Sequence, residues 1–343
     1  MGESYRGAGV DIDEAKRAVD LIARAAATTT TPAVLGGVGG FGSLFRFDPS
    51  THPDPVLVAS TDGVGSKLKL AIALERYDTI GVDLVHHCIN DIAVQGADPL
   101  FFLDYLAVGR LRAEVAAEIV TGVANACAAA GIALVGGETA ELPDLYRGDD
   151  FDLAGFIVGV VAAADVIDGS GVREGDAVLG LPSSGLHTNG YSLARRVFDE
   201  GDWSRSAPGL EGTIGEALLE PHRSYLDEIR ILRRALRTVG GDALAFAHIT
   251  GGGWVDNIPR TLPGGLGVAV ELGSWPVPLI FSLIQERGDI ADDEMVRAFN
   301  LGIGLTCVVR PEHEDAALAA LTEARRVGTV VSVPLGSARV TFA

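Results

Sequence analysis

A stripe of polar side chains on an otherwise apolar segment is the clearest sign of chemistry in this sequence. Between Ile80 and Gln95 the residues repeat with helical spacing, and four polar ones fall at i, i+4, i+7 and i+8: Asp83, His87, Asn90 and Asp91. Buried carboxylates are costly unless something pairs with them. Mg²⁺ with phosphate oxygens is one such partner, and salt bridges to arginine are the alternative. His87, at the edge of the stripe, is expected to be hydrogen-bonded rather than a ligand.

The segment before this helix adds another carboxylate and a cation. A strand predicted over Val56–Thr61 runs into a glycine loop and then into an apolar helix that reaches Leu74. Lys67, one of only three lysines, lies where a helix N-terminus offers free N–H groups to an anion. The loop is not a P-loop, because Ser66 stands where that motif needs glycine. We expect this loop to approach a phosphate through Asp62, Gly63, Gly65 and Lys67; the alternative for Lys67 is a solvated surface lysine.

Two further glycine clusters extend the candidate nucleotide site. The cluster from Gly36 to Gly42 matches a dinucleotide fingerprint by letter, but the prolines that follow it cannot form the required helix. We interpret Gly37, Gly39 and Gly40 as a loop that covers a phosphate, with a simple turn as the alternative. Glu138 follows a short apolar strand, and at a strand end it would add an oxygen ligand. The predicted metal ligands are thus Asp62, Asp83, Asp91 and Glu138.

Two loops in the second half of the chain are rich in hydrogen-bond donors. Ser183–Gly190 joins a predicted strand to a helix, and Thr250–Gly253 is another glycine turn that opens a helix. Such loops suit a phosphate or a polar substrate. The predicted substrate-binding residues are Ser183, Ser184, Gly185, His187, Asn189, Thr250, Gly251 and Gly252. The alternatives are a loop histidine without a role and a tight packing turn.

Length and pattern predict two α/β domains. At roughly 150 residues per domain, 343 residues suggest two. A polar, glycine-rich stretch at Asp168–Asp176 places the boundary between residues 170 and 171. We expect an N-terminal mixed sheet with helices over 1–170 and an α+β domain over 171–343, in which Glu312–Arg326 forms a strong helix.

Composition excludes several classes of partner. Asp and Glu number 46 against 27 Lys and Arg, a net charge of −19, which excludes a basic footprint for nucleic acid or a membrane surface. The longest apolar run, Leu153–Ala164, is shorter than the ~20 residues of a membrane span. Three widely spaced cysteines and no signal peptide predict a cytoplasmic protein. A mean hydropathy of +0.28 suggests excess apolar surface and a homodimer formed through the N-terminal domain.

Together these motifs resemble the phosphoribosylformylglycinamidine cyclo-ligase family, also called aminoimidazole ribonucleotide synthetase. The matching stretches run in order over nearly the whole chain: Ser4–Asp13, Gly36–Gly42, Thr61–Lys67, Asp83 with Asn90-Asp91, Gln95–Pro99, Phe101–Tyr105, Gly136–Glu141, Ser183–Ser192, Thr250–Arg260 and Phe299-Asn300. Some positions depart from the family pattern: Leu186 stands where proline is frequent, Thr28–Thr31 fill a stretch that is often basic, and His86-His87 replace apolar residues.

The resemblance implies a two-domain fold, a dimer formed through the N-terminal sheets, and ATP with Mg²⁺ as ligands. It implies a reaction of purine synthesis in which formylglycinamidine ribonucleotide and ATP are converted to aminoimidazole ribonucleotide, ADP and phosphate. Lys67, Asp62 and His187 are then the expected catalytic residues. The loops at Ser183–Asn189 and Thr250–Gly253 are expected to face the N-terminal cleft and hold the ribonucleotide.

Other members of the same superfamily are the alternatives. A selenophosphate synthetase would need a reactive N-terminal cysteine, and none precedes Cys88. A formylglycinamidine ribonucleotide synthase would carry a His-Asn-His-Pro signature, which this sequence lacks. A thiamine monophosphate kinase and a catalytically inactive assembly subunit are the remaining alternatives, and the intact polar residues argue against the latter.

Overall fold

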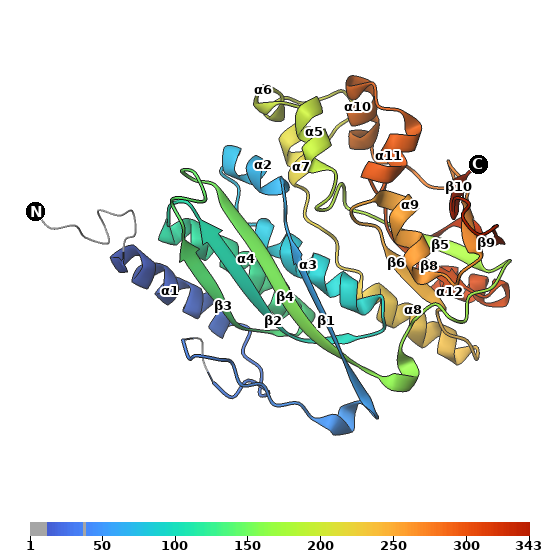
Figure 1. Cartoon of the computed structure of the whole chain (residues 1–343), viewed down its shortest axis with the longest axis horizontal. Helices are drawn as coiled ribbons and strands as arrows, with labels where there is room; N and C mark the ends of the chain where they lie inside the picture. The colour runs from blue at the N-terminus through green and yellow to red at the C-terminus, as the bar shows by residue number, and fades with distance from the viewer. Residues whose placement is uncertain (1–11, 37–38) are drawn as a thin grey trace, which may run out of the picture. The chain divides into compact units, whose positions relative to one another are not determined.

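The fold is seen in a computed structural model that describes residues 12–36 and 39–343. The chain forms two compact units (Figure 1). Unit 1 comprises residues 1–92 and 97–164, and unit 2 comprises residues 93–96 and 165–343. Each unit contains one β-sheet with helices, so the predicted α/β class with two domains is confirmed. The change of unit at Ala164–Asp165 lies a few residues before the boundary predicted from the sequence.

Unit 1 is built on a four-stranded mixed sheet with the strand order β1-β4-β2-β3. β4 is antiparallel to both β1 and β2, whereas β2 and β3 are parallel. The strands are β1 (Pro55–Gly63), β2 (Asp98–Val108), β3 (Ala133–Glu141) and β4 (Phe151–Ala162), and the helices are α1 (Ile12–Ala27), α2 (Lys67–Ala73), α3 (Ile80–Ala93) and α4 (Ala113–Ala130). In Figure 1, α3 and α4 lie behind this sheet.

The register of unit 1 brings together residues that are far apart in the sequence. Asp62 pairs with Gly155, Gly155 with Asp104, and Asp104 with Gly137, so the four form one row across the sheet. A Cβ at Gly155 would lie 2.3 Å from the Phe102 ring and 2.9 Å from Leu84 of α3. The missing side chain therefore lets α3 approach the sheet closely, and this face, which we call the helix face, holds Asp62 against α3.

The opposite side of the sheet, the outer face, carries apolar side chains. Alternate residues of paired strands share a face, and the register assigns Leu57, Ala59, Phe101, Leu103, Phe156 and Val158 to this side. Leu57 is 64% exposed and Phe156 is 43% exposed. Large apolar side chains at this exposure, gathered on one sheet face, are typical of an interaction surface.

Unit 2 is built on a six-stranded sheet with the order β10-β7-β9-β5-β8-β6. Its strands are β5 (Ala177–Pro182), β6 (Ala245–His248), β7 (Leu266–Val270), β8 (Ile303–Val309), β9 (Arg325–Ser332) and β10 (Val340–Phe342). β5 and β6 are both antiparallel to β8. They are therefore parallel to each other, and their carboxyl ends meet at one edge of the sheet.

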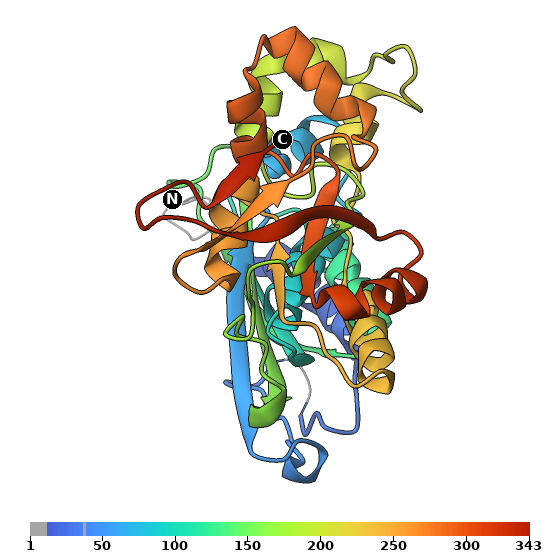
Figure 2. The same cartoon turned by 90° about the vertical axis from the view of Figure 1, so that its right-hand side faces the viewer.

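The helices of unit 2 surround this sheet, and Trp254 and Trp275 stack in its core at 5.0 Å between ring centroids. They are α5 (Tyr191–Val197), α6 (Glu200–Trp203), α7 (Ile214–Leu219), α8 (Leu226–Thr238), α9 (Gly253–Asn257), α10 (Leu279–Gly288), α11 (Asp292–Ala298) and α12 (Glu314–Ala320). α8 and α12 lie side by side (Figure 2).

The structure corrects two sequence-based predictions about elements. The helix predicted over Glu312–Arg326 is confirmed in its first part and wrong in its second, because α12 spans Glu314–Ala320 and Arg325 already begins β9. Val327 and Val330 of that strand are fully buried, and its pairing with β5 and β7 outweighs the helix-forming residues before it. Glu138 lies inside β3 rather than at its end, because β3 continues to Glu141.

Among the described helices, α4 is long and apolar enough to cross a membrane by length and composition, and half of it is buried in the protein. Its buried residues pack against α1 and the sheet, as in the core helix of a globular domain.

Candidate active site

The centre of the candidate site in unit 1 is a buried ion pair. Lys67 Nζ lies 2.8 Å from both carboxylate oxygens of Asp83, and neither side chain is exposed to solvent. Each charge offsets the desolvation cost of the other. The alternative interpretation of Lys67 as a solvated surface residue is therefore wrong, and the cation that pairs with the polar stripe is a lysine rather than an arginine.

A second pair joins β1 to α3. Asp62 accepts a hydrogen bond from His87 Nε2 at 2.9 Å, and Ser60 Oγ donates to Asp91 Oδ2 at 3.1 Å. Burial alone would lower the pKa of His87, because it disfavours the charged imidazolium. The hydrogen bond to Asp62 and the negative charges of Asp62, Asp91 and Asp83 outweigh this effect, so the pKa of His87 is raised. His87 is thus hydrogen-bonded, as expected from the sequence.

One of the two glycines of this loop has a structural reason. Gly65 adopts φ +69°, in the left-handed region that favours glycine, two residues before α2. A Cβ at Gly63 would lie 3.4 Å from the Leu153 carbonyl oxygen of the neighbouring strand, an ordinary van der Waals contact. Asn90 is fully buried on α3 between the carboxylates of the stripe. The structure therefore gathers Asp62, Lys67, Asp83, Asn90 and Asp91 where β1, α2 and α3 meet.

The other part of the candidate nucleotide site is a pocket of about 330 Å³ at the β3 edge of the sheet. Gly39 and Gly40 line it together with Glu138, and Ser43 Oγ attaches the glycine loop to β3 by donating to the Val135 carbonyl at 2.5 Å. Gly37 lies outside the described residues. The pocket thus brings Gly39, Gly40 and Glu138 together, and their role in binding a nucleotide stays a prediction.

Glu138 does not lie with the other predicted metal ligands. Its partner in the sheet is Tyr105, which pairs with Ala154, which pairs with Gly63. At ~4.8 Å between strands, three steps separate Glu138 from the end of β1 by about 14 Å. One octahedral Mg²⁺, with oxygen ligands at about 2.1 Å, cannot readily join positions this far apart. A binding role for Glu138 stays a prediction, and it would concern a separate ion or another part of the ligand.

In unit 2 the predicted substrate loops lie side by side. Ser183–Gly190 follows β5 and Thr250–Gly253 follows β6, at the edge where the two carboxyl ends meet. A Cβ at Gly251 would lie 3.3 Å from Asn189 Oδ1. Asn300, three residues before the start of β8, holds the first loop: it accepts from Ser183 Oγ at 3.0 Å and donates to the Gly185 carbonyl at 2.9 Å. The helices that follow these loops, α5 and α9, have only seven and five residues, so their macrodipoles are short and the loop groups are the main donors.

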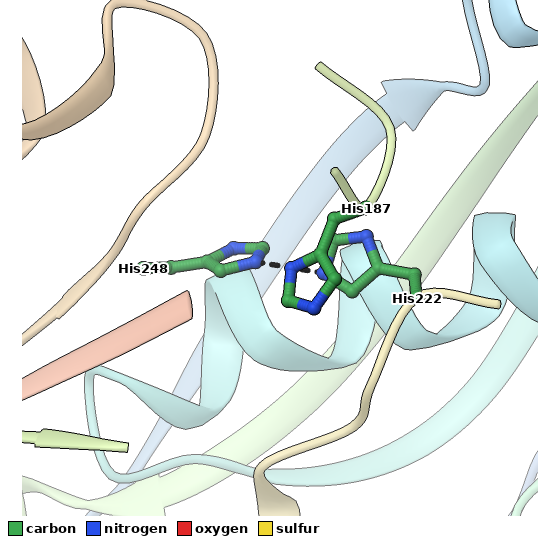
Figure 3. A group of neighbouring side chains, drawn as sticks. All are labelled: His187, His222 and His248. Atoms are coloured by element: carbon green, nitrogen blue, oxygen red, sulfur yellow. Dashed lines mark hydrogen bonds between the residues drawn. The ribbon is translucent and has the colours of Figure 1, made fainter. Parts of the chain in front are cut away.

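His187 belongs to a buried group of three histidines (Figure 3). Its ring stacks on that of His222 at 4.0 Å between centroids and 18° between planes, and its Nε2 accepts from the Ser184 N–H at 3.3 Å. His222 Nε2 lies 3.0 Å from His248 Nε2, and Thr188 Oγ1 lies 3.3 Å from His222 Nδ1. The imidazoles thus link the loop after β5 to the end of β6.

The ligand atoms of these three histidines lie within 4.8 Å of one another, close enough to suggest a metal site. A metal ion bound to imidazole nitrogen lies near the ring plane. The nearly parallel, stacked planes of His187 and His222 cannot both contain one ion. In this arrangement the three histidines form a hydrogen-bonded cluster that supports the two loops. His187 itself adopts a positive φ of 63°.

Sequence reasoning missed several residues of these sites. Asn300 appeared only as part of a family motif, and His222 lies in no motif. His248 ends a strand two residues before the glycine turn, which was a usable signal. Asp104 lines the unit 1 pocket and is 5% exposed, but in the sequence it appeared only as part of the family motif Phe101–Tyr105, inside an apolar strand.

Comparison with known proteins agrees with these two units. Residues 43–161 match the family described as AIR synthase related protein, N-terminal domain, and residues 173–341 match the corresponding C-terminal domain. Among solved structures, the hydrogenase maturation protein HypE in complex with ATP has a TM-score of 0.67 at 20% identity, covering 97% of this chain and 91% of that one. A thiamine-monophosphate kinase from Stenotrophomonas maltophilia K279a has a TM-score of 0.64 at 19% identity, covering 94% and 95%. These similarities show a shared fold.

Curated relatives are much closer in sequence. The phosphoribosylformylglycinamidine cyclo-ligase of Desulfitobacterium hafniense is 52% identical over 92% of this chain and 91% of the relative. That of Anaeromyxobacter dehalogenans (strain 2CP-C) is 52% identical over 96% of both. By fold and domain content the chain is a two-domain α/β protein of the AIR synthase related class. Within that class, it belongs to the phosphoribosylformylglycinamidine cyclo-ligase family.

Proposed function

We propose that this protein closes the five-membered ring of 5-aminoimidazole ribonucleotide from formylglycinamidine ribonucleotide, with ATP as the activating substrate and ADP and phosphate as products. The observation that carries the proposal is family membership at about half identity over more than nine-tenths of the chain. ATP would convert the formyl oxygen into a phosphate leaving group. An amidine nitrogen of the same substrate would then attack that carbon and displace the phosphate.

The site in unit 1 would bind the nucleotide. Asp62 and Asp91 offer carboxylate oxygens beside the buried Lys67–Asp83 pair, an oxygen-rich set that suits Mg²⁺. Mg²⁺ there would neutralise phosphate charge during transfer of the phosphoryl group. Lys67 would lie near the phosphates, and its pairing with Asp83 fixes its position before the nucleotide arrives. The protein's share of catalysis is then mainly positioning and charge neutralisation.

The loops of unit 2 would bind the ribonucleotide. The protein carries a net charge of −19, so general attraction cannot help to bind an anionic phosphate. The hydroxyl groups of Ser183, Ser184 and Thr250 already donate to protein acceptors. The amide of Asn189 and backbone N–H groups of the two loops would hold the phosphate without a buried cation. His187 would position the substrate, because its ring is held by the stack on His222.

A homodimer formed through the outer face of the unit 1 sheet, in the cytoplasm, completes the proposal. The exposed Leu57 and Phe156 support this interface. All three cysteines are buried, and burial raises the pKa of each thiol, as expected of structural residues in a reducing compartment.

A coupled assay of ADP release tests the activity. Purified protein with ATP, Mg²⁺ and formylglycinamidine ribonucleotide should release ADP, whereas thiamine monophosphate or selenide in place of the ribonucleotide should not support release. ADP release with thiamine monophosphate or selenide, but not with the ribonucleotide, would assign the chain to one of the alternative activities.

A further inference from the structure

Asp104 is a buried carboxyl that the proposed reaction, as described above, does not use. It belongs to β2 on the helix face of the sheet, it is 5% exposed, and it lines the pocket formed by the glycine loop, α1 and β3. Its neighbours on the helix face include Cys127 of α4, whose thiol pKa is raised by burial and by the charge of Asp104. Glu138 is the other acidic residue among those that line the pocket.

The carboxyl of Asp104 is open to the pocket because residue 137 has no side chain. An ideal Cβ at Gly137 would lie 2.3 Å from Asp104 Oδ1 and 2.7 Å from the Asp104 carbonyl oxygen. Any side chain at this position would therefore occupy the space directly beside the carboxyl. Gly137 has no positive φ that would otherwise require glycine. The close approach to Asp104 is thus the structural reason for glycine there.

The rest of the pocket lining suits a flat, largely apolar ring. α1 contributes Val19, Ile22 and Ala26, and β3 contributes Leu134. The backbone of the glycine loop can approach a ring closely. Ser43, Glu138 and Thr139 add polar groups to the lining. A pocket with apolar walls and a few polar groups is the usual design of a site that recognises a heteroaromatic ring. The volume of about 330 Å³ has room for a purine base.

We propose that Asp104 recognises the adenine base of ATP by accepting a hydrogen bond from its exocyclic amino group, and so selects 6-aminopurine over 6-oxopurine nucleotides. This inference rests on the proposed function for the identity of the nucleotide. A 6-oxopurine would place a carbonyl oxygen against the carboxylate, where neither group can donate. Because this mismatch would be buried, it should cost on the order of ten- to a hundredfold in affinity.

Asp104→Asn tests the assignment, because an amide can accept from an amino group and can also donate to a carbonyl. The kcat/KM values for ATP and ITP, and the Kd values by calorimetry, are measured in the wild type and the variant at pH 8.5, where Asp104, with a pKa of about 7, is ionised. The wild type should prefer ATP by at least about tenfold, and the variant should lose most of that preference. The KM for the ribonucleotide should not change. Asp98→Asn, at the exposed start of the same strand, is the matched control and should keep the wild-type ratio.

Several outcomes would overturn the inference. One is equal affinity of the wild type for ATP and ITP; another is an unchanged ATP/ITP ratio in Asp104→Asn. A preference for ATP over 2′-deoxy-ATP that disappears in the variant would assign Asp104 to the ribose instead.

The binding measurement needs no turnover, so it separates this inference from the proposed function. If the wild type prefers ATP but does not consume the ribonucleotide, only the proposed function fails. If Asp104→Asn does not fold, the ATP/ITP affinity ratio of the wild type is measured at decreasing pH instead. The preference for ATP should shrink, because the carboxyl gains a proton and can then donate to the carbonyl of ITP. A constant ratio would overturn the inference.

Discussion

At the scale of single residues, the carboxylates of the polar stripe in unit 1 have different partners. Asp83 pairs with the Lys67 ammonium, whereas Asp91 accepts a hydrogen bond from the Ser60 hydroxyl. A substitution at Asp91 therefore tests the proposed metal site without breaking the buried ion pair.

Asp91→Asn should reduce turnover on the order of 100-fold while the protein remains folded. The amide oxygen can still accept from Ser60, so the structural role is kept, but the negative charge for Mg²⁺ is lost. Steady-state kinetics at limiting Mg²⁺ measures the effect, and circular dichroism checks the fold. Asp78→Asn, at a surface pair with Arg76, is the control. Wild-type turnover of Asp91→Asn at limiting Mg²⁺ would refute the metal site.

Asp104 should leave a signature in the pH dependence of stability. Burial raises its pKa from 3.8 to about 7. The folded state therefore binds this proton more tightly than the unfolded state. The contribution to the free energy of unfolding is fully present below pH 3.8 and is lost as pH rises to about 7.

Asp104→Asn should remove the loss of stability that the wild type shows as pH rises, because an amide does not titrate. Urea unfolding between pH 4 and 8 should show a flatter profile for the variant, with a free energy of unfolding at pH 8 above that of the wild type by on the order of 2 kcal/mol. A variant that is less stable than the wild type at pH 8, and whose free energy of unfolding depends on pH as in the wild type, would show that burial does not raise the pKa of the Asp104 carboxyl.

At the scale of elements, the close packing of α3 on the sheet of unit 1 depends on Gly155. A Cβ there would lie 2.3 Å from the Phe102 ring, which is fully buried. Gly155→Ala should destabilise the protein by roughly 1–3 kcal/mol through overpacking. It should also lower activity, because α3 carries the polar stripe. Gly264→Ala is the control, because a Cβ there has open space, the φ is not positive, and the residue lies in unit 2, outside the candidate nucleotide pocket. Thermal unfolding equal to that of the wild type would contradict the packing argument.

How much the sequence predicts differs between elements and sites. Period-2 and period-3.6 patterns located β1, β2, β4, α3 and α4 within a few residues, because burial on one or two faces determines those patterns. The prediction was wrong in the C-terminal part of the chain, where Arg325 and Arg326 fit the end of a helix by local pattern but lie in β9. The pairing of this strand with β5 is a long-range contact that no local pattern contains.

The site residues show the same division. The polar stripe was visible because all its members lie on one helix. Asp104 was found only as a member of the motif Phe101–Tyr105, because its environment depends on Gly137, from another strand, and on α1. His222 likewise gains its role only from contacts with His187 and His248.

At the scale of the whole molecule, the outer face of the unit 1 sheet is the surface most suited to a second copy of the chain. Leu57→Glu should give a monomer with a mass near 35.6 kDa at micromolar concentration, whereas the wild type should give twice that mass. Ile231→Glu, at a similarly exposed apolar residue on α8, should leave the dimer intact. Multi-angle light scattering decides, and a monomeric wild type would remove the proposed interface.

The central claim is that phosphoryl transfer to the formyl oxygen precedes ring closure. The most direct measurement supplies formylglycinamidine ribonucleotide labelled with ¹⁸O in the formyl group, together with ATP and Mg²⁺, and analyses the products by mass spectrometry. The account predicts one ¹⁸O atom in the released phosphate for each aminoimidazole ribonucleotide formed. Unlabelled phosphate released with ADP would mean that the protein hydrolyses ATP without activating this oxygen, and would contradict the account.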